Sequence, residues 1–226
     1  QLLYIFTPLC GDILEAIGSA HISHENGAFP QNIIDQWNLR GIGHKFAAYV
    51  LFLMASAIHG GFVPSPTFEA VFNAVSLAVA WTMLGLAAVA ARPYLQRFRL
   101  EGVEAFYVVA AGLTLSSWWV IGQPEYHVAL LVVTGVGLGL SDKAWLQALA
   151  GIMLALTVFP KGVTLLSGAG GFLLLAALRS LHGEWRPLIP VAVTGAAALV
   201  VFFAGYLFVF PQEIADLRRM SLTEGA

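Results

Sequence analysis

Long apolar runs separated by short polar breaks dominate the chain. Apolar stretches of about 18 residues or more form helices that cross a bilayer, because a helix rises about 1.5 Å per residue and the hydrocarbon core is about 30 Å thick. Most breaks contain a proline or a group of charged residues, which end helices. The predicted helical segments are 46–63, 68–91, 105–122, 128–140, 144–159, 163–178 and 188–210.

The polar stretches divide the chain into four parts. Residues 1–10 are typical of the end of a truncated first span, and residues 11–43 form a polar window with several carboxylates and histidines. Residues 44–210 hold the predicted helical bundle, and residues 211–226 form a polar tail after which we expect the chain to continue. The pattern therefore predicts one transmembrane domain over residues 1–226.

The composition supports a membrane protein. Hydrophobic residues make up 58% of the chain and charged residues 11%, and the mean hydropathy is +0.79. Soluble domains carry about 25% charged residues, and the short alternating segments of a transmembrane barrel are not seen. We therefore expect an all-α polytopic bundle with about 7–8 membrane segments. The single cysteine excludes an internal disulfide, and no basic face suits nucleic acid.

Basic residues fall mainly on alternate loops. Cytoplasmic loops carry an excess of Lys and Arg. The arginines of 92–99 assign the loop after residue 91 to the cytoplasm, and counting onward assigns Lys143 and the loop 179–186 to the same side, with Lys161 as the exception. Counting backward leaves two alternatives. The polar window is cytoplasmic if 46–63 and 68–91 both cross fully, and external if one of them is re-entrant or interfacial.

The start of the polar window has the period of an amphipathic helix. In "DILEAIGSAHI" the apolar positions share one face, at Ile13, Ala16, Ile17 and Ala20. Asp12 and Glu15 lie on another face, so the helix is predicted to lie along the membrane surface with its carboxylates away from lipid. Asp12 is either a helix N-cap or a functional base or metal ligand at the bilayer boundary.

Two further groups of polar residues flank the spans. Arg40 and Lys45 follow Trp37 and suit either a lipid phosphate or simple anchoring at the interface. Glu125 and His127, in "QPEYH", lie at the mouth of a span, where the carboxylate is either solvated in a loop or a second functional acid.

The histidines suggest a metal or haem site and the glycines a phosphate-binding loop, but the sequence pattern favours neither. His21 and His24 have the i, i+3 spacing of a metal pair but lack a third ligand of similar quality, and His59 has no partner near the middle of a span. We therefore assign no metal ligands and expect no haem, while a divalent metal ion stays open as a cofactor. The glycine-rich "GVGLGL" and "SGAGG" indicate close helix packing, because neither shows the pattern of a phosphate-binding loop.

The arrangement resembles the GT-C class of membrane glycosyltransferases. The resemblance lies in an acidic residue after a first span, then "NGAFP", the stretch "FPKGVTLL" after a later span, and "FPQEIADLRR" near the end. It implies a polytopic helical fold, and a polyprenyl-phosphate sugar as donor for transfer to an acceptor at the membrane surface. It also implies an external first loop, and we expect a plasma-membrane location. Membrane lipids and the lipid-linked donor are the expected partners.

The resemblance also implies roles for individual residues. Asp12 matches the first-loop acid and Glu125 the acid of the next external loop. Asp12 would accept the proton of the acceptor hydroxyl, and Arg40 or Lys45 would hold the donor phosphate. Glu15 and His127 complete the predicted substrate-binding set. The chain lacks the Asp-x-Asp pair that would indicate a bound metal.

Two other function classes remain. A non-catalytic subunit of a larger membrane complex would use the glycine-rich helix faces for packing. A transporter or lipid scramblase fits the number of spans, although the scarcity of charged residues in the span centres disfavours ion coupling.

Overall fold

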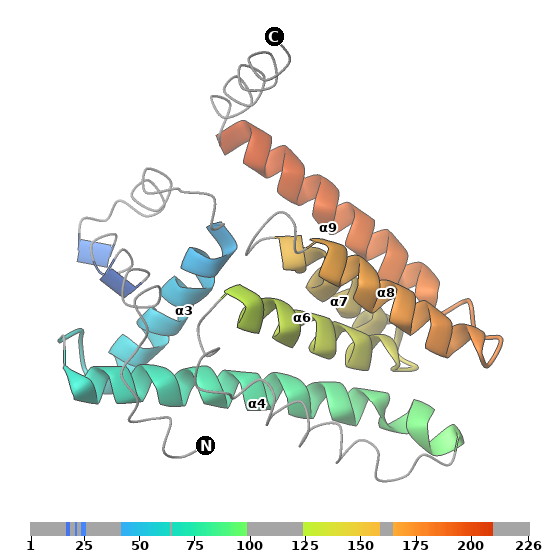
Figure 1. Ribbon diagram of the computed structural model, residues 1–226, viewed down its shortest axis with the longest axis horizontal. Coiled ribbons are helices and arrows are strands. Elements are labelled where there is room, and N and C mark those ends of the chain that lie inside the picture. Colours follow the sequence, from blue (N-terminus) through green and yellow to red (C-terminus); the bar gives the residue numbers. More distant parts are fainter. Residues whose placement is uncertain are drawn as a thin grey trace.

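The computed structural model describes residues 17–18, 21, 24–25, 42–63, 65–98, 124–158 and 165–209, with the backbone alone for 42–48, 124–125 and 206–209 (Figure 1). This part of the chain contains helices and turns and no strand, so the predicted all-α class is confirmed there. The helices are α3 (Ile42–His59), α4 (Pro66–Arg97), α6 (Pro124–Gly139), α7 (Ala144–Ala155), the 3-10 turn η2 (Leu156–Val158), α8 (Leu165–Ser180) and α9 (Leu188–Val209).

Two of these helices are long and apolar enough to cross a bilayer. They are α4, with 32 residues, and the first 18 residues of α9, Leu188–Gly205. The apolar stretches of α3, α6, α7 with η2, and α8 are shorter. Within the described residues, membrane association therefore has weak support from length and composition, and the predicted number of spans is not established.

The turn between α3 and α4 lies where the sequence predicts a break. Gly60 and Gly61 have positive φ angles of 82° and 128°, a conformation that other residues rarely adopt. The side chain of Ser65 then accepts a hydrogen bond from the amide of Phe68 at 3.2 Å, and Pro66 occupies the first turn of α4. Serine at the cap followed by proline is a strong signal for a helix start.

The end of α4 differs from the prediction. We expected the helix to end near residue 91, before Pro93, but it continues to Arg97. Tertiary contacts hold this last turn. The hydroxyl of Tyr94 donates to the carbonyl of Leu178 at 2.7 Å, and Arg97 pairs with two carboxylates from other turns. These contacts offset the helix hydrogen bond that a proline removes.

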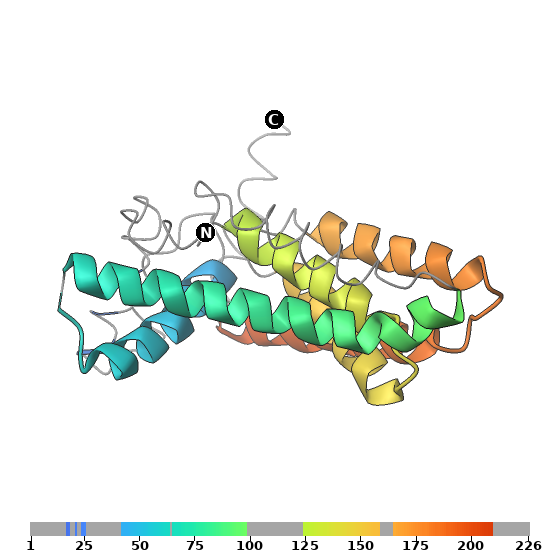
Figure 2. The same cartoon turned by 90° about the horizontal axis from the view of Figure 1, so that it is seen from below.

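The described helices run in two opposite directions. Helix α6 runs parallel to the second half of α4, because Tyr126 packs with Leu77 and Leu84 while Gly137 approaches Ala87. Helix α8 runs the same way, with Leu175 against Gly139, whereas α3, α7 and α9 run the opposite way (Figures 1 and 2). From α6 to α9, each helix therefore runs opposite to the one before it, as helices joined by short turns do.

Glycines let these helices approach closely, as predicted. A Cβ atom on Gly151 would lie 2.2 Å from the carbonyl oxygen of Val191 in α9, and one on Gly168 would lie 2.3 Å from that of Leu154 in α7. Both "GVGLGL" and "SGAGG" fall mostly within helices, α6 and α8. Their role in packing is therefore confirmed for Gly168 and for Gly139, whose added Cβ would lie 2.4 Å from Leu175.

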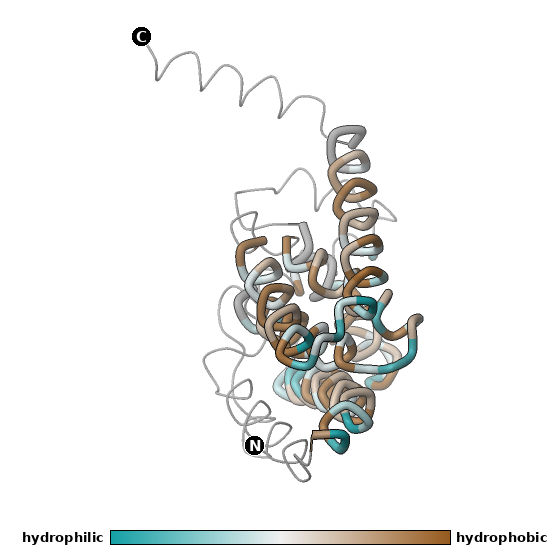
Figure 3. Tube along the Cα trace, turned by 90° about the vertical axis from the view of Figure 1, so that its right-hand side faces the viewer, coloured by the Kyte–Doolittle hydropathy of each residue, from teal (hydrophilic) through white to brown (hydrophobic). Residues whose placement is uncertain are grey.

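The core has three parts that follow α4 from its beginning to its end. Ile17, α3 and the first turns of α4 form one cluster, and the middle of α4 with the start of α6 forms the second. The third joins the end of α4 to α6, α7, α8 and the start of α9. Figure 3 looks from the end where α4 finishes and shows hydrophilic turns in front of largely apolar helices.

Candidate functional site

The structure describes a few residues of the polar window, and these lie against the end of α3 and the beginning of α4. Ile17 is helical and buried in the cluster of Phe52 and Phe68, as the predicted apolar face requires. The ring of His21 lies 4.2 Å from that of Phe62, between ring centroids. Asp12, Glu15 and Arg40, three of the predicted site residues, lie outside the described residues.

The histidines of this window contact aromatic side chains and one carboxylate. His21 Nε2 lies 3.4 Å from Glu25 Oε1, one helical turn later, and the ring of His24 stands edge-on to Phe52 at 6.4 Å. Nowhere in the described residues do three side chains of His, Cys, Asp or Glu gather as a metal ion needs. The contacts favour packing for these two histidines.

Glu125 and His127 belong to the first turn of α6 and not to a loop before it, which corrects their predicted setting. Pro124 begins the helix, a position that suits proline because the first amide of a helix has no partner in the helix. His127 is half-buried beside Tyr126, with 5.7 Å between ring centroids, and Tyr126 is buried against α4. For Glu125, and for Lys45 near the start of α3, only the backbone is described.

The polar window and the start of α6 contact consecutive parts of α4. The cluster that contains Ile17 includes Phe68, Phe72 and Val75 of α4, and the cluster that contains Tyr126 begins at Leu77. The first group therefore lies at the beginning of α4 and the second at its middle. The predicted acids stand close to these anchors in the sequence, Asp12 five residues before Ile17 and Glu125 next to Tyr126.

The opposite end of the bundle holds a network of charged side chains. Arg97 Nη1 donates to Glu184 Oε1 at 2.9 Å, and Arg97 Nη2 pairs with Asp142 Oδ1. Glu184 Oε2 accepts from Arg179 Nη1, so one carboxylate joins two arginines. The network brings together the end of α4, the α6–α7 turn and the α8–α9 turn. Three loops that the charge pattern assigned to one side therefore meet at one end.

Arg179 is the centre of this network. Its side chain is fully buried, and its Nη2 donates to the carbonyls of Gly139 at 3.1 Å and Ser141 at 2.8 Å. Its guanidinium carbon lies 4.8 Å from the ring centroid of Tyr94, within the range of a cation–π interaction. The charge pattern predicts Arg179 only as a basic residue of a cytoplasmic loop. The sequence signal for the network is that basic and acidic residues occur together in the loops around residues 97, 142 and 184.

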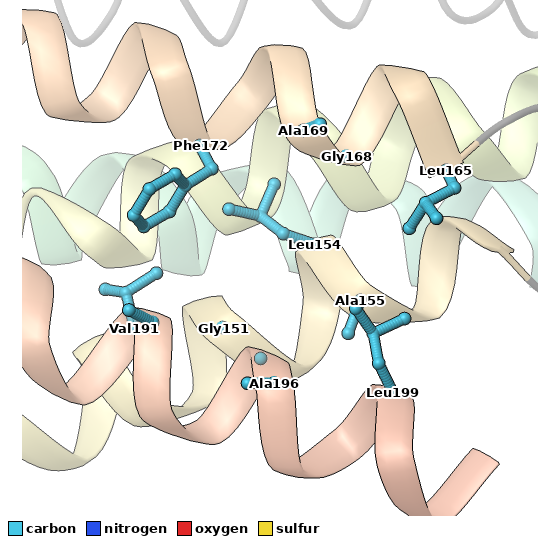
Figure 4. A pocket seen from close by; sticks show the side chains of 12 residues that line it. Gly151, Leu154, Ala155, Leu165, Gly168, Ala169, Phe172, Val191, Ala196 and Leu199 are labelled. Atoms are coloured by element: carbon cyan, nitrogen blue, oxygen red, sulfur yellow. The ribbon is translucent and has the colours of Figure 1, made fainter. Parts of the chain in front are cut away.

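Two cavities suit different ligands. A polar one of about 500 Å³, hereafter the basic cavity after its two arginines, lies beside the network. Two arginines and two carboxylates are among the residues that line it, which are Arg97, Asp142, Gln147, Gly183, Glu184, Trp185, Arg186 and Pro187. An apolar one of about 280 Å³ lies between α7, α8 and α9 (Figure 4). Small residues such as Gly151, Gly168 and Ala155 line the apolar cavity, with Leu154, Phe172 and Val191 pointing into the same region. The apolar cavity lacks ionisable side chains among its lining residues, so it offers space without acid–base chemistry.

Comparison with known proteins adds no further assignment. No family model matches the chain, and neither a curated protein nor a solved structure is significantly similar to it.

Proposed function

We propose that the chain is a membrane glycosyltransferase of the GT-C type, which transfers a sugar from a polyprenyl phosphate to an acceptor at the membrane surface. The observation that carries the proposal is the packing of Ile17 and Tyr126 in successive clusters along α4, the first at its beginning and the second at its middle. In the GT-C arrangement the two functional acids work on one side of the membrane. The two candidate acids, Asp12 and Glu125, are close in sequence to these two anchors.

The topology proposed with this function is a bundle of about 7–8 membrane segments, with the polar window outside the plasma membrane and the charged network in the cytoplasm. One observation supports it. The arginine-rich turns gather at one end, as the positive-inside rule requires of cytoplasmic loops. The proposal takes α3 as re-entrant or interfacial, the alternative that leaves the polar window external.

The proposed chemistry assigns the proton transfer to Asp12. Its carboxylate accepts the proton of the acceptor hydroxyl as the oxygen bonds to the anomeric carbon, and the polyprenyl phosphate leaves as an anion. Arg40 or Lys45 stabilises that anion by a charge-assisted hydrogen bond. Glu125 is the second acid, and Glu15 and His127 contact the sugar or the acceptor.

Asp12→Asn in the full chain tests this proposal. The substitution keeps the shape of the side chain and removes the base, so sugar transfer from a panel of undecaprenyl-phosphate hexoses should fall about 10²- to 10⁴-fold. Glu25→Gln is the matched control, because Glu25 is an exposed carboxylate of the same window that pairs with His21, and it should retain activity within a few-fold. Both proteins must insert and elute as a single species. Full activity of Asp12→Asn, or no transfer by the wild type from any such donor, would refute the proposal.

A non-catalytic membrane subunit is the second candidate, favoured by the exposed face of α9. Ile189, Val193, Val200 and Val201 of this helix are more than half exposed, which leaves a long apolar face that the described chain does not cover. If a partner helix covers that face, substitution of Val193 by Trp should release a co-purifying membrane protein while Asp12→Asn has no effect. The opposite pair of results favours the enzyme.

A further inference from the structure

The basic cavity adjoins an apolar groove, and Asp142 lines both. The groove, hereafter the α4–α7 groove, has a volume of about 430 Å³. Helix α4 contributes Met83, Leu86 and Pro93 to one wall, and α7 contributes Leu146, Leu149 and Met153 to the other. Helix α6 forms the floor with Thr134 and Leu138. An apolar groove that ends in a charged cavity suits a lipid molecule, which has apolar acyl chains and a polar headgroup.

The dimensions of the α4–α7 groove match one leaflet of a bilayer. Met83 and Pro93 are ten residues apart on one helix, which corresponds to about 15 Å. Half of a hydrocarbon core of about 30 Å is the same length. The wall residues repeat at intervals of three or four along α4 and α7, so both walls are continuous stripes along their helices. One extended acyl chain therefore fits the groove with its polar end at Asp142.

The charges at this end favour an anion. Arg97 and Arg179 are paired with Asp142 and Glu184. Lys143, which lines the α4–α7 groove, and Arg186, which lines the basic cavity, make no ion pair with any residue that the structure describes. Both are exposed and are therefore available to a ligand. Two unpaired cations on the two sides of the shared Asp142 attract a group with negative charge.

Two exposed tryptophans indicate the depth of the membrane surface. Trp145 borders the α4–α7 groove and is 64% exposed, and Trp185 borders the basic cavity and is 62% exposed. Tryptophan is enriched at the level of lipid headgroups, where its ring meets both apolar and polar surroundings. The junction of the two cavities therefore lies where a phospholipid carries its phosphate.

We propose that this junction binds an anionic phospholipid, with one acyl chain in the α4–α7 groove and the headgroup phosphate held by Lys143 and Arg186. The headgroup charge selects the lipid, because an acyl chain gains little by leaving a bilayer whose interior is as apolar as the groove. The site lies at the other end of the bundle from the anchors of the proposed catalytic residues, and its test does not depend on sugar transfer.

Quenching of tryptophan fluorescence by brominated lipids measures this binding. The full chain is reconstituted in phosphatidylcholine vesicles that contain either brominated phosphatidylglycerol or brominated phosphatidylcholine. Each basic residue near an anionic surface contributes about fivefold. The phosphatidylglycerol should therefore reach half-quenching at a roughly 25-fold lower mole fraction, because two cations act together. Equal quenching by the two lipids would overturn the proposal.

Variants that remove positive charges at different places locate the effect. The double variant Lys143→Gln with Arg186→Gln should abolish the preference, whereas Arg92→Gln removes an exposed charge near the end of α4 that lines neither cavity and should preserve it. An equal loss in Arg92→Gln would show diffuse attraction to the surface and would refute a specific site.

Two further measurements separate the lipid from other sources of the signal. Replacing Trp145 and Trp185 by Phe should remove the selective quenching, and its persistence would place the lipid elsewhere. Glycerol 3-phosphate at millimolar concentration should not relieve the quenching, because it lacks the acyl chain. Relief by this soluble phosphate would contradict the lipid assignment.

Discussion

Replacement of the buried Arg179 by Met tests whether the charged network stabilises the bundle. The side chain of Arg179 is fully buried and touches Glu184, the carbonyls of Gly139 and Ser141, and the ring of Tyr94. Methionine keeps much of the apolar stem and removes every one of these polar contacts. The end of α8 would then be held to the α6–α7 turn by apolar packing and by the bridge that Arg97 makes between Glu184 and Asp142.

The expected loss of stability follows from the number of polar groups that lose Arg179 as a partner. Removing one member of a buried ion pair costs about 3–5 kcal/mol, because the other member stays buried without its charge partner. Glu184 keeps Arg97 as a partner at 2.9 Å and is 24% exposed, which favours the lower end of that range. The two carbonyls lose a charged donor, which adds to the cost. We expect the free energy of unfolding to fall by about 3 kcal/mol, or about 6–12 °C in Tm for a chain of this size.

Thermal unfolding in detergent, followed by tryptophan fluorescence, measures this change. Arg92→Met is the matched control, because Arg92 is an exposed arginine of the same end and its loss should shift the free energy by no more than about 0.5 kcal/mol. Arg179→Lys should fall between the two, since lysine keeps the charge but not the fork of donors. A Tm of Arg179→Met within 2 °C of the wild type would show that apolar packing, and not the network, holds this end together.

Two further substitutions test the helix contacts. Gly168→Leu should lower the free energy of unfolding by about 1–3 kcal/mol, because its Cβ would meet the backbone of Leu154 at 2.3 Å; Gly170→Leu, with nothing within 4 Å, should be neutral or stabilising by up to about 0.8 kcal/mol. Equal effects of the two leucines on Tm would contradict the close packing of α7 and α8. Thr194→Val should cost only about 0.6 kcal/mol, because the hydroxyl has a single hydrogen and its loss removes one hydrogen bond, to the carbonyl of Ala148 or of Pro190, each at 2.7 Å. A loss above 2 kcal/mol in the same melting assay would mean that the bond to Ala148 is indispensable.

Hydropathy predicted most of the helices because each of them coincides with an apolar run of the sequence. The predicted 188–210 compares with Leu188–Val209, and 163–178 with Leu165–Ser180. The prolines were harder to interpret. Pro66 begins a helix that the sequence pattern starts at residue 68, and Pro93 lies inside that helix because contacts with residues about 85 positions later hold the last turn. Rules that consider only neighbouring residues in the sequence cannot predict contacts over such a separation.

The charged network shows a second limit of the sequence. The loop charges could be assigned to one side by counting, and the structure brings those loops together. Which carboxylate meets which arginine depends on the rotation of each helix about its axis, which packing sets. In the polar window, the buried Ile17 supports the predicted amphipathic helix. The catalytic roles of Asp12 in this window and of Glu125 in α6 stay predictions.

The ion pair between Arg97 and Glu184 has a consequence for biosynthesis, because 87 residues separate its members. Ribosomes add about 5–20 residues per second, so about 4–17 s pass between the synthesis of Arg97 and the synthesis of Glu184. During that interval the turns around Arg97 and Asp142 are already made, and Arg179 arrives just before Glu184. The end of the bundle therefore closes only when the α8–α9 turn emerges. A chain that stalls before this turn would leave Arg97 with Asp142 alone, a species that quality-control proteases could distinguish from the finished protein.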